Sequence, residues 1–285
     1  MEKDIDLHRS IIVIDKPAGM TSFQVTDFVR KELGINKAGH SGTLDPEVTG
    51  VLPILLGRAS RMLDYFIHQN KEYVGIAHLH QDMEIEKIKK TIKAKFLGKI
   101  MQLPPVKSRV KRQEREREIV SFEILEKHEK DILFLVECEA GTYIRKLIHN
   151  LGEKLGIGMH MSELRRTKAS IFLESQAVTL YDFTKAAEEF NQGNPEKLSR
   201  MLHPAEIITK ILPKIEVKTE AIEMLKHGSP LFREMIKNHE NFNKGDFLAV
   251  MSQDKLVEIA QAELESSSIK DLKCNLVAKP KTVLN

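Results

Sequence analysis

The segment from Lys37 to Gly50 places the strongest constraint on the fold. It reads KAGHSGTLDPEVTG and holds three glycines, with no apolar residues at helical or strand spacing. Such a segment is predicted to be an irregular loop, which the rest of the fold must hold in one shape. The apolar run VLPILL follows it at once, from Val51 to Leu56, and predicts a buried strand. The loop is therefore the first place to look for chemistry.

Strand and helix patterns alternate on both sides of this loop. Before it, a short strand at residues 11–14 ends in a Pro/Gly turn, and Thr21 with Gln24 forms the capping-box pattern of a helix that Gly34 ends. After it, we expect a helix at 59–66, a strand at 72–79, a helix at 85–96, strands at 119–125 and 132–139, a helix beginning past Gly141, a strand near 167–172 and helices over 181–201. Strands and helices are therefore interleaved along this part of the chain.

The pattern changes near Pro204, beyond which short strands and one helix, Thr219 to His227, are expected. A chain of 285 residues has the length of two domains. We therefore predict a larger domain at 1–208 and a smaller one at 209–285, with the boundary between Pro204 and Leu212.

Basic residues are concentrated rather than spread along the chain. Forty-four Lys and Arg against 41 Asp and Glu leave a formal charge of only +3, too mild by itself to indicate a polyanionic partner. The clustered residues are Lys107, Arg109, Lys111, Arg112, Arg115 and Arg117, followed later by Arg165, Arg166 and Lys168. Phosphate contact is a natural use for such clusters. The alternative is a solvated charged face, because Glu114 and Glu116 interrupt the first cluster.

The two cysteines, Cys138 and Cys274, fit neither a disulfide framework nor a zinc-ligand spacing. The N-terminal sequence lacks the apolar core of a signal peptide, and no apolar run approaches the roughly 18 residues of a membrane span. We expect a cytoplasmic protein that has no membrane partner.

Three residues are candidates for chemistry, each with a plainer alternative. Asp45, between glycines and a proline, has the setting of a nucleophile or general base, or of a simple turn before Pro46. Arg145, at a predicted helix start, suits bidentate contact with a carboxylate, or is a solvated helix arginine. Tyr73 suits stacking on a displaced base, or is an ordinary strand tyrosine.

Four blocks in order, IDKPAGMTS, KAGHSGTLDPEVTGVLPILLGRASR, GTYIRKLIHNLGEKLG and HMSELRRT, resemble the TruB/dyskerin family of RNA pseudouridine synthases. The resemblance implies an α+β fold, with a mixed-sheet catalytic domain that has a central cleft and a small β-rich PUA domain at the C-terminal side. It implies a reaction without cofactor or metal. The residue roles that it implies are Asp45 as catalytic aspartate, Arg145 as its ion-pair partner, Tyr73 as the residue packing on the flipped uracil, Leu164 as a pocket wall, His40 and Thr43 as substrate-binding residues, and the basic clusters as RNA-binding residues.

Three segments, KAGHSGTLDP, PPVKSRVKR and AKPKTVLN, resemble the archaeal and eukaryotic guide-dependent branch of this family. That branch implies a box H/ACA guide RNA, an rRNA or tRNA substrate, small Nop-type and Gar-type proteins, and a kink-turn-binding protein reached through the RNA. Two alternatives stay open: a stand-alone synthase acting on the tRNA T-loop, and a non-catalytic RNA-binding scaffold. The chain departs from the branch by starting close to the first motif, by acidic residues within 113–118 and by a polar stretch at 265–272.

Overall fold

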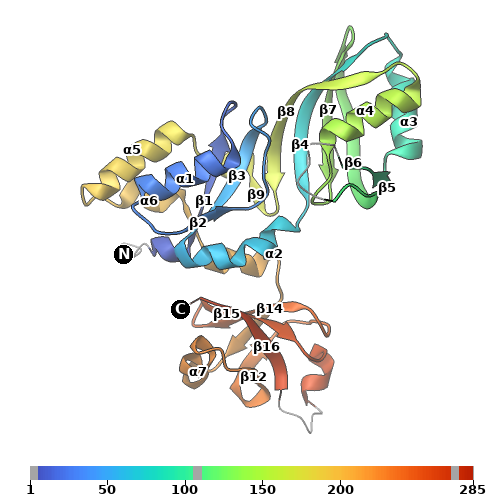
Figure 1. Cartoon of the computed structure of the whole chain (residues 1–285). Coiled ribbons are helices and arrows are strands. Elements are labelled where there is room, and N and C mark those ends of the chain that lie inside the picture. The colour runs from blue at the N-terminus through green and yellow to red at the C-terminus, as the bar shows by residue number, and fades with distance from the viewer. Residues whose placement is uncertain (1–5, 105–110, 271–275, 285) are drawn as a thin grey trace.

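The computed structural model describes residues 6–104, 111–270 and 276–284, which form two β-sheets (Figure 1). The strands of the larger sheet are β1 (Ser10–Lys16), β2 (Ala38–His40), β3 (Thr49–Leu56), β4 (Lys71–Leu79), β5 (Gly98–Gln102), β6 (Arg115–His128), β7 (Asp131–Cys138), β8 (Met159–Ala169), β9 (Phe172–Leu173) and β10 (Leu202–Pro204). Their order is β10-β1-β3-β8-β4-β7-β6-β5, with β2 beside β3 and β9 beside β8. Parallel and antiparallel pairs both occur, so the sheet is mixed.

The larger sheet is divided into two halves at the junction of β3 and β8. These strands meet in parallel through the pairs Thr49–Arg165 and Gly50–Arg166. Gly50 has a φ of +103°, and a Cβ there would lie 2.2 Å from the carbonyl oxygen of Arg166, so only glycine fits this close approach. Because the pairing is so short, the two halves diverge on either side of it and leave a central cleft.

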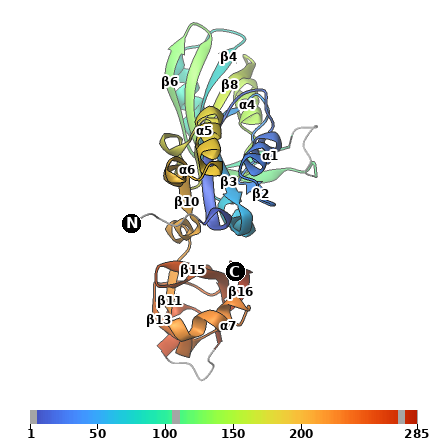
Figure 2. The same cartoon turned by 90° about the vertical axis from the view of Figure 1, so that its left-hand side faces the viewer.

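Separate groups of helices cover the two halves. They are α1 (Ser22–Glu32), α2 (Leu63–Ile67), α3 (Ile85–Lys95), α4 (Ile144–Leu155), α5 (Leu180–Asn191) and α6 (Glu196–Met201). The apolar faces of α3 and α4 pack on β4, β6 and β7 in one core, and α1, α5 and α6 pack on β1 and β3 in another (Figures 1 and 2). Each half therefore has its own core.

The predicted start of α1 is confirmed. The Thr21 hydroxyl accepts a hydrogen bond from the Gln24 N–H at 3.1 Å, and the Gln24 side-chain oxygen accepts one from the Thr21 N–H at 2.8 Å. This reciprocal cap satisfies two N–H groups that the first turn leaves unpaired. It also fixes the point at which the chain leaves the loop after β1.

The smaller sheet consists of β11 (Lys214–Val217), β12 (Leu231–Phe232), β13 (Ile236–His239), β14 (Phe247–Ser252), β15 (Lys255–Ala262) and β16 (Leu276–Val283), with α7 (Ile222–Lys226) packed on it. Its strand order is β12-β16-β15-β14-β11-β13. The mixed first sheet and this β-rich second unit confirm the predicted α+β class.

The two units are joined through a shared apolar cluster that includes Ile208 on one side and Leu256 and Ile259 on the other. Polar contacts reinforce it. Arg9 donates to the carbonyl oxygen of Leu284 at 2.8 Å, and Arg61 donates to that of Val283 at 2.8 Å. The second unit is therefore held against the region around α2, as Figure 1 shows.

Several elements differ from the sequence-based prediction: β5 was not expected, and β6 begins at Arg115 rather than at Ile119. Residues Ala38–His40, expected to lie in an irregular loop, form β2 and pair with β3. Strand β8 begins at Met159 rather than near Thr167, because its exposed edge is polar enough to hide the alternation that predicts a strand. No helix in the described residues is long and apolar enough to cross a membrane.

Candidate active site

The carboxylate of Asp45 and the guanidinium of Arg145 meet although 100 residues separate them in the sequence. The distance from Arg145 Nη2 to Asp45 Oδ2 is 3.0 Å. The contact is a single hydrogen bond, not the bidentate pair that the sequence suggested. Both side chains are about 60% exposed, at 61% and 60%, so the pair itself contributes little to stability in water. The pair places a cation against one oxygen of the carboxylate.

The loop that carries Asp45 is fastened to the loop and helix that follow β1. The buried Ser22 hydroxyl accepts a hydrogen bond from Leu44 N–H at 2.8 Å and donates one to the Leu44 carbonyl at 3.1 Å. The buried Lys16 ammonium donates to the carbonyl oxygens of Pro17, Met20 and Pro46, at 2.6 to 2.8 Å. The residues on both sides of Asp45 are thus fixed, which leaves its side chain exposed but its backbone immobile.

Burial lowers the pKa of Lys16, and Glu47 opposes this shift while Arg166 adds to it. An ammonium removed from water is tolerated here because three carbonyl oxygens replace its hydration. Sequence reasoning assigned no role to Lys16 or Ser22. Both lie in the block IDKPAGMTS, which belongs to the family resemblance, but a motif does not show which residues are in contact.

Tyr73 lies on β4 and packs against the core of the second half. Burial raises the pKa of its hydroxyl, and the nearby Arg166 guanidinium opposes that shift. Arg166 in turn donates to the carbonyl oxygens of Val51 at 2.8 Å and Gly42 at 2.9 Å. It therefore connects Tyr73 to β3 and to the loop that carries Asp45.

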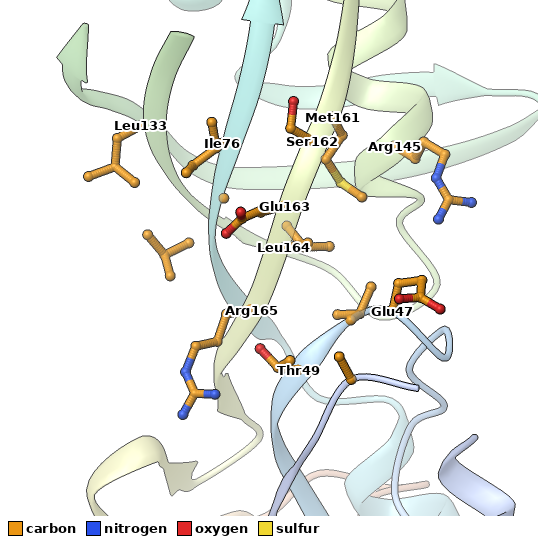
Figure 3. Close-up of a pocket in the computed structure, with 14 residues that line it drawn as sticks. Glu47, Thr49, Ile76, Leu133, Arg145, Met161, Ser162, Glu163, Leu164 and Arg165 are labelled. Carbon is orange, nitrogen blue, oxygen red and sulfur yellow. The ribbon is translucent and has the colours of Figure 1, made fainter. Parts of the chain in front are cut away.

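A cleft of about 680 Å³ lies beside the ion pair at the junction of the two halves. Leu164 and Arg145 both line it, as do Glu47 and Arg165. In Figure 3, Arg145 and Glu47 lie on one side of β8, and Arg165 and Leu133 lie on the other. The cleft thus combines apolar wall residues with charged groups, the composition that a flat heteroaromatic ring bearing polar edges requires.

His40 is the last residue of β2, and Thr43 lies in the loop that follows it. His40 Nδ1 is 3.0 Å from the Thr26 hydroxyl, and its Nε2 is 3.2 Å from the Thr43 hydroxyl. Burial, followed by the charge of Arg166, lowers the pKa of His40. These contacts tie the loop to α1, while the exposed Thr43 stays accessible.

The basic residues proposed from the sequence fall into different environments. Lys107 and Arg109 lie outside the described residues, and Lys111 and Arg112 are exposed. Arg166 is only 1% exposed, which corrects the expectation that it contacts RNA, because its guanidinium already binds two backbone carbonyls. Arg165 is partly buried and paired with Asp15 and Glu174.

The arrangement suits acid–base or nucleophilic chemistry on a ligand bound in the cleft. An exposed carboxylate with a guanidinium on one oxygen can attack an electrophilic carbon or accept a proton with the other oxygen.

Three family descriptions match the chain in order. The descriptions are "TruB family pseudouridylate synthase (N terminal domain)" over residues 30–144, "tRNA pseudouridylate synthase B C-terminal domain" over 145–210 and "PUA domain" over 213–284. Together they cover most of the sequence.

Similar proteins come from archaea. A probable tRNA pseudouridine synthase B of Methanopyrus kandleri is 43% identical over 247 residues, which is 86% of this chain and 72% of that protein. One from Sulfurisphaera tokodaii is 39% identical over 283 residues, covering 99% of this chain and 84% of that protein.

Solved structures show the same fold along nearly the whole chain. A chain in a Cbf5-Nop10-Gar1 complex matches with a TM-score of 0.91 at 38% identity, covering 98% of this chain and 86% of the other. A chain in an H/ACA RNP bound to a substrate RNA containing 2′-deoxyuridine matches with a TM-score of 0.90 at 36% identity, covering 98% and 86%.

Proposed function

Because this chain belongs to the TruB family of RNA pseudouridine synthases and ends in a PUA domain, we propose that it isomerises guide-selected uridines as the catalytic subunit of a box H/ACA particle. Asp45 is the catalytic carboxylate of this proposal. The observation that carries it is the 3.0 Å ion pair between Asp45 and Arg145 at the edge of the cleft.

The reaction rearranges one nucleotide without a net change in composition. The bond between N1 of uracil and C1′ of ribose breaks, the base turns, C5 joins C1′, and the C5 proton is lost while N1 gains one. Asp45 acts in these steps as nucleophile or as base, and each of these roles needs a carboxylate held in one place. Arg145 provides that placement through its bond to one carboxylate oxygen.

Tyr73 and Leu164 receive the displaced base. Leaving the stack costs a few kcal/mol, and contact with an aromatic ring and an apolar wall offsets part of that cost. Leu164 lines the cleft beside Arg145, and Tyr73 lies on the adjoining strand β4. His40 and Thr43 contact the nucleotide from the loop side, in keeping with the exposed Thr43 hydroxyl.

Guide dependence is supported by the similarity to a chain of an H/ACA RNP bound to a substrate RNA, at a TM-score of 0.90, and to a chain of a Cbf5-Nop10-Gar1 complex, at a TM-score of 0.91. On this basis the partners are a guide RNA and small proteins of the Nop10 and Gar1 kinds. The exposed Lys111 and Arg112 suit phosphate contact near the catalytic half. The firm junction between the two units supports simultaneous contact of catalytic and PUA domains with one RNA. A kink-turn-binding protein enters the proposal only through the RNA.

A second candidate is a tRNA synthase that needs no guide. It is favoured by the name that the curated relatives carry, probable tRNA pseudouridine synthase B. Both candidates use the same Asp45 and Arg145, so the two readings differ in what selects the uridine.

Purified protein is incubated with uridine-labelled rRNA fragments or tRNA, with and without an H/ACA guide and the small partner proteins, and pseudouridine is measured. Product that needs both the guide and Asp45 is the expected result. Product from tRNA without guide overturns guide dependence. RNA binding without product under every condition would replace the catalytic proposal with a scaffold.

A further inference from the structure

Gln102 is the last residue of β5, and its side chain is almost completely buried, at 2% exposure. The side-chain oxygen accepts a hydrogen bond from the Tyr143 N–H at 3.0 Å, and the side-chain nitrogen donates to the Tyr143 carbonyl at 3.3 Å. Because the backbone N–H only donates and the carbonyl only accepts, the orientation of the amide is forced. One side chain therefore holds both polar groups of one distant backbone residue.

Tyr143 is the N-cap of α4, and Arg145 is the second residue of that helix. A tyrosine cannot supply the short side-chain oxygen with which Ser, Thr, Asp or Asn cap a helix. Gln102 is not a substitute for such a cap, because it binds the N–H and the carbonyl of Tyr143 rather than the free N–H groups of the first turn, but it anchors the backbone immediately before α4. It fixes the position and direction in which α4 begins. It therefore also determines where the guanidinium of Arg145, two residues after Tyr143, meets Asp45.

The remaining contacts of Arg145 do not explain its position. Its guanidinium is 61% exposed and makes one hydrogen bond, at 3.0 Å, to a carboxylate that is itself 60% exposed. A pair of that kind in water is too weak to hold a long side chain by itself. The fixed element is the backbone at the start of α4, which Gln102 anchors.

We propose that Gln102 is a positioning residue for the isomerisation, acting through the start of α4 to place Arg145 on Asp45. This inference rests on the proposed function, because it takes that ion pair as the catalytic one. Gln102 also pairs with Arg115 across β5 and β6. It thus connects the end of this strand pair to the helix that carries Arg145.

The first test compares Gln102→Leu with the wild-type chain in the complete guide particle. Leucine has a similar volume but neither hydrogen-bonding group. We expect kcat to fall about 10- to 100-fold, the usual effect of a misplaced catalytic group, with KM and RNA affinity nearly unchanged. The exposed Gln81→Leu is the matched control and should behave as wild type.

A double-variant cycle separates positioning from general structural damage. If Gln102 acts through Arg145, the variant carrying Gln102→Leu and Arg145→Ala is no slower than Arg145→Ala alone. Losses that multiply would overturn the inference, as would a normal kcat in Gln102→Leu.

Gln102→Glu gives an independent readout and covers the case in which the leucine variant does not fold. A protonated glutamic acid both donates and accepts like the amide, whereas the carboxylate repels the Tyr143 carbonyl. The ratio of the variant's kcat to that of wild type should therefore rise as pH falls. A ratio that does not change with pH counts against the positioning role.

These experiments also distinguish two failures. An active Asp45→Asn variant would remove the proposed catalytic role itself. An inactive Asp45→Asn variant beside a fully active Gln102→Leu variant would remove only the role of Gln102.

Discussion

Arg165 donates two hydrogen bonds to the carboxylate of Asp15, from Nη1 to Oδ1 and from Nη2 to Oδ2, each at 2.9 Å. Asp15 belongs to β1 in the first half of the larger sheet, and Arg165 belongs to β8 in the second. Glu174 binds the remaining Nε at 2.5 Å. The ion pair therefore links the two halves at the junction where β3 and β8 share only two residue pairs. The positive charge of Arg165 is already neutralised by Asp15 and Glu174.

Arg165→Ala should lower the stability of the protein more than its affinity for RNA. Bidentate, partly buried bonds to a charged group are worth about 1 to 3 kcal/mol, and Asp15 would lose its partner. Urea unfolding should show a lower midpoint, while the salt dependence of RNA binding keeps its slope. Asp15→Asn should destabilise in the same way. A shallower salt slope with an unchanged midpoint would instead make Arg165 a phosphate contact.

Lys111 and Arg112 should show the opposite behaviour, because both side chains are exposed. Replacing both with glutamine removes two cations that are free to displace counterions from RNA. We expect the slope of log affinity against log salt to become shallower by about 1.4, from a contribution of about 0.7 for each contact with single-stranded RNA. Thermal unfolding should be unchanged. An unaltered slope would show that this stretch is a solvated surface.

Local elements of the fold could be predicted from the sequence where they depend on residues close together in the chain. The Thr21–Gln24 capping box and the apolar face of α4 depend on neighbours within one helical turn, so they can be read directly. The start of strand β8 was predicted near Thr167, but the strand begins at Met159. Its alternation of buried and exposed residues depends on which of its side chains face the cleft. That exposure exists only after the two halves pack.

The fate of adjacent arginines illustrates the same limit. Arg165 and Arg166 are indistinguishable in the letters LRRT, and both were assigned to RNA. Alternation along β8 sends one toward Asp15 and the other into the protein, where Val51 and Gly42 carbonyls receive it. The ordered motifs indicated the family, but the direction of each side chain is set by strand register, which no motif records.

Asp45→Asn should abolish turnover, by at least about 1,000-fold, because the amide can neither attack nor accept a proton as a carboxylate does. Its shape is nearly the same, and Leu44 stays bonded to Ser22, so the loop should keep its structure. RNA affinity measured by filter binding should be close to wild type. Substantial pseudouridine formation by this variant would exclude Asp45 as the catalytic residue.

Arg145→Ala should slow the reaction about 100- to 1,000-fold, since it removes the group that orients the carboxylate and balances its charge. Arg145→Lys keeps the charge but replaces the planar guanidinium with a flexible, compact ammonium, so it should restore only part of the rate. Single-turnover measurements separate this effect from RNA binding. Equal rates for the lysine and alanine variants would show that charge at this position contributes nothing by itself.

Glu258 should make the protein less stable as pH rises toward 8. It is fully buried on β15, opposite Val250 and Val283 of the neighbouring strands, and neither carboxyl oxygen finds a hydrogen-bond partner among the described residues. Burial raises its pKa from 4.5 to about 8. The folded state thus binds a proton that the unfolded chain releases between these values, so the free energy of unfolding falls as pH rises through that window.

Glu258→Met should flatten this dependence in thermal melts from pH 5 to 8. It should also add about 1 to 3 kcal/mol of stability at pH 8, because it replaces an unpaired carboxyl with an apolar chain. The exposed Glu220→Met serves as control. An equal pH dependence in the Glu258→Met variant and the wild type would mean that this carboxyl is hydrated or paired in solution.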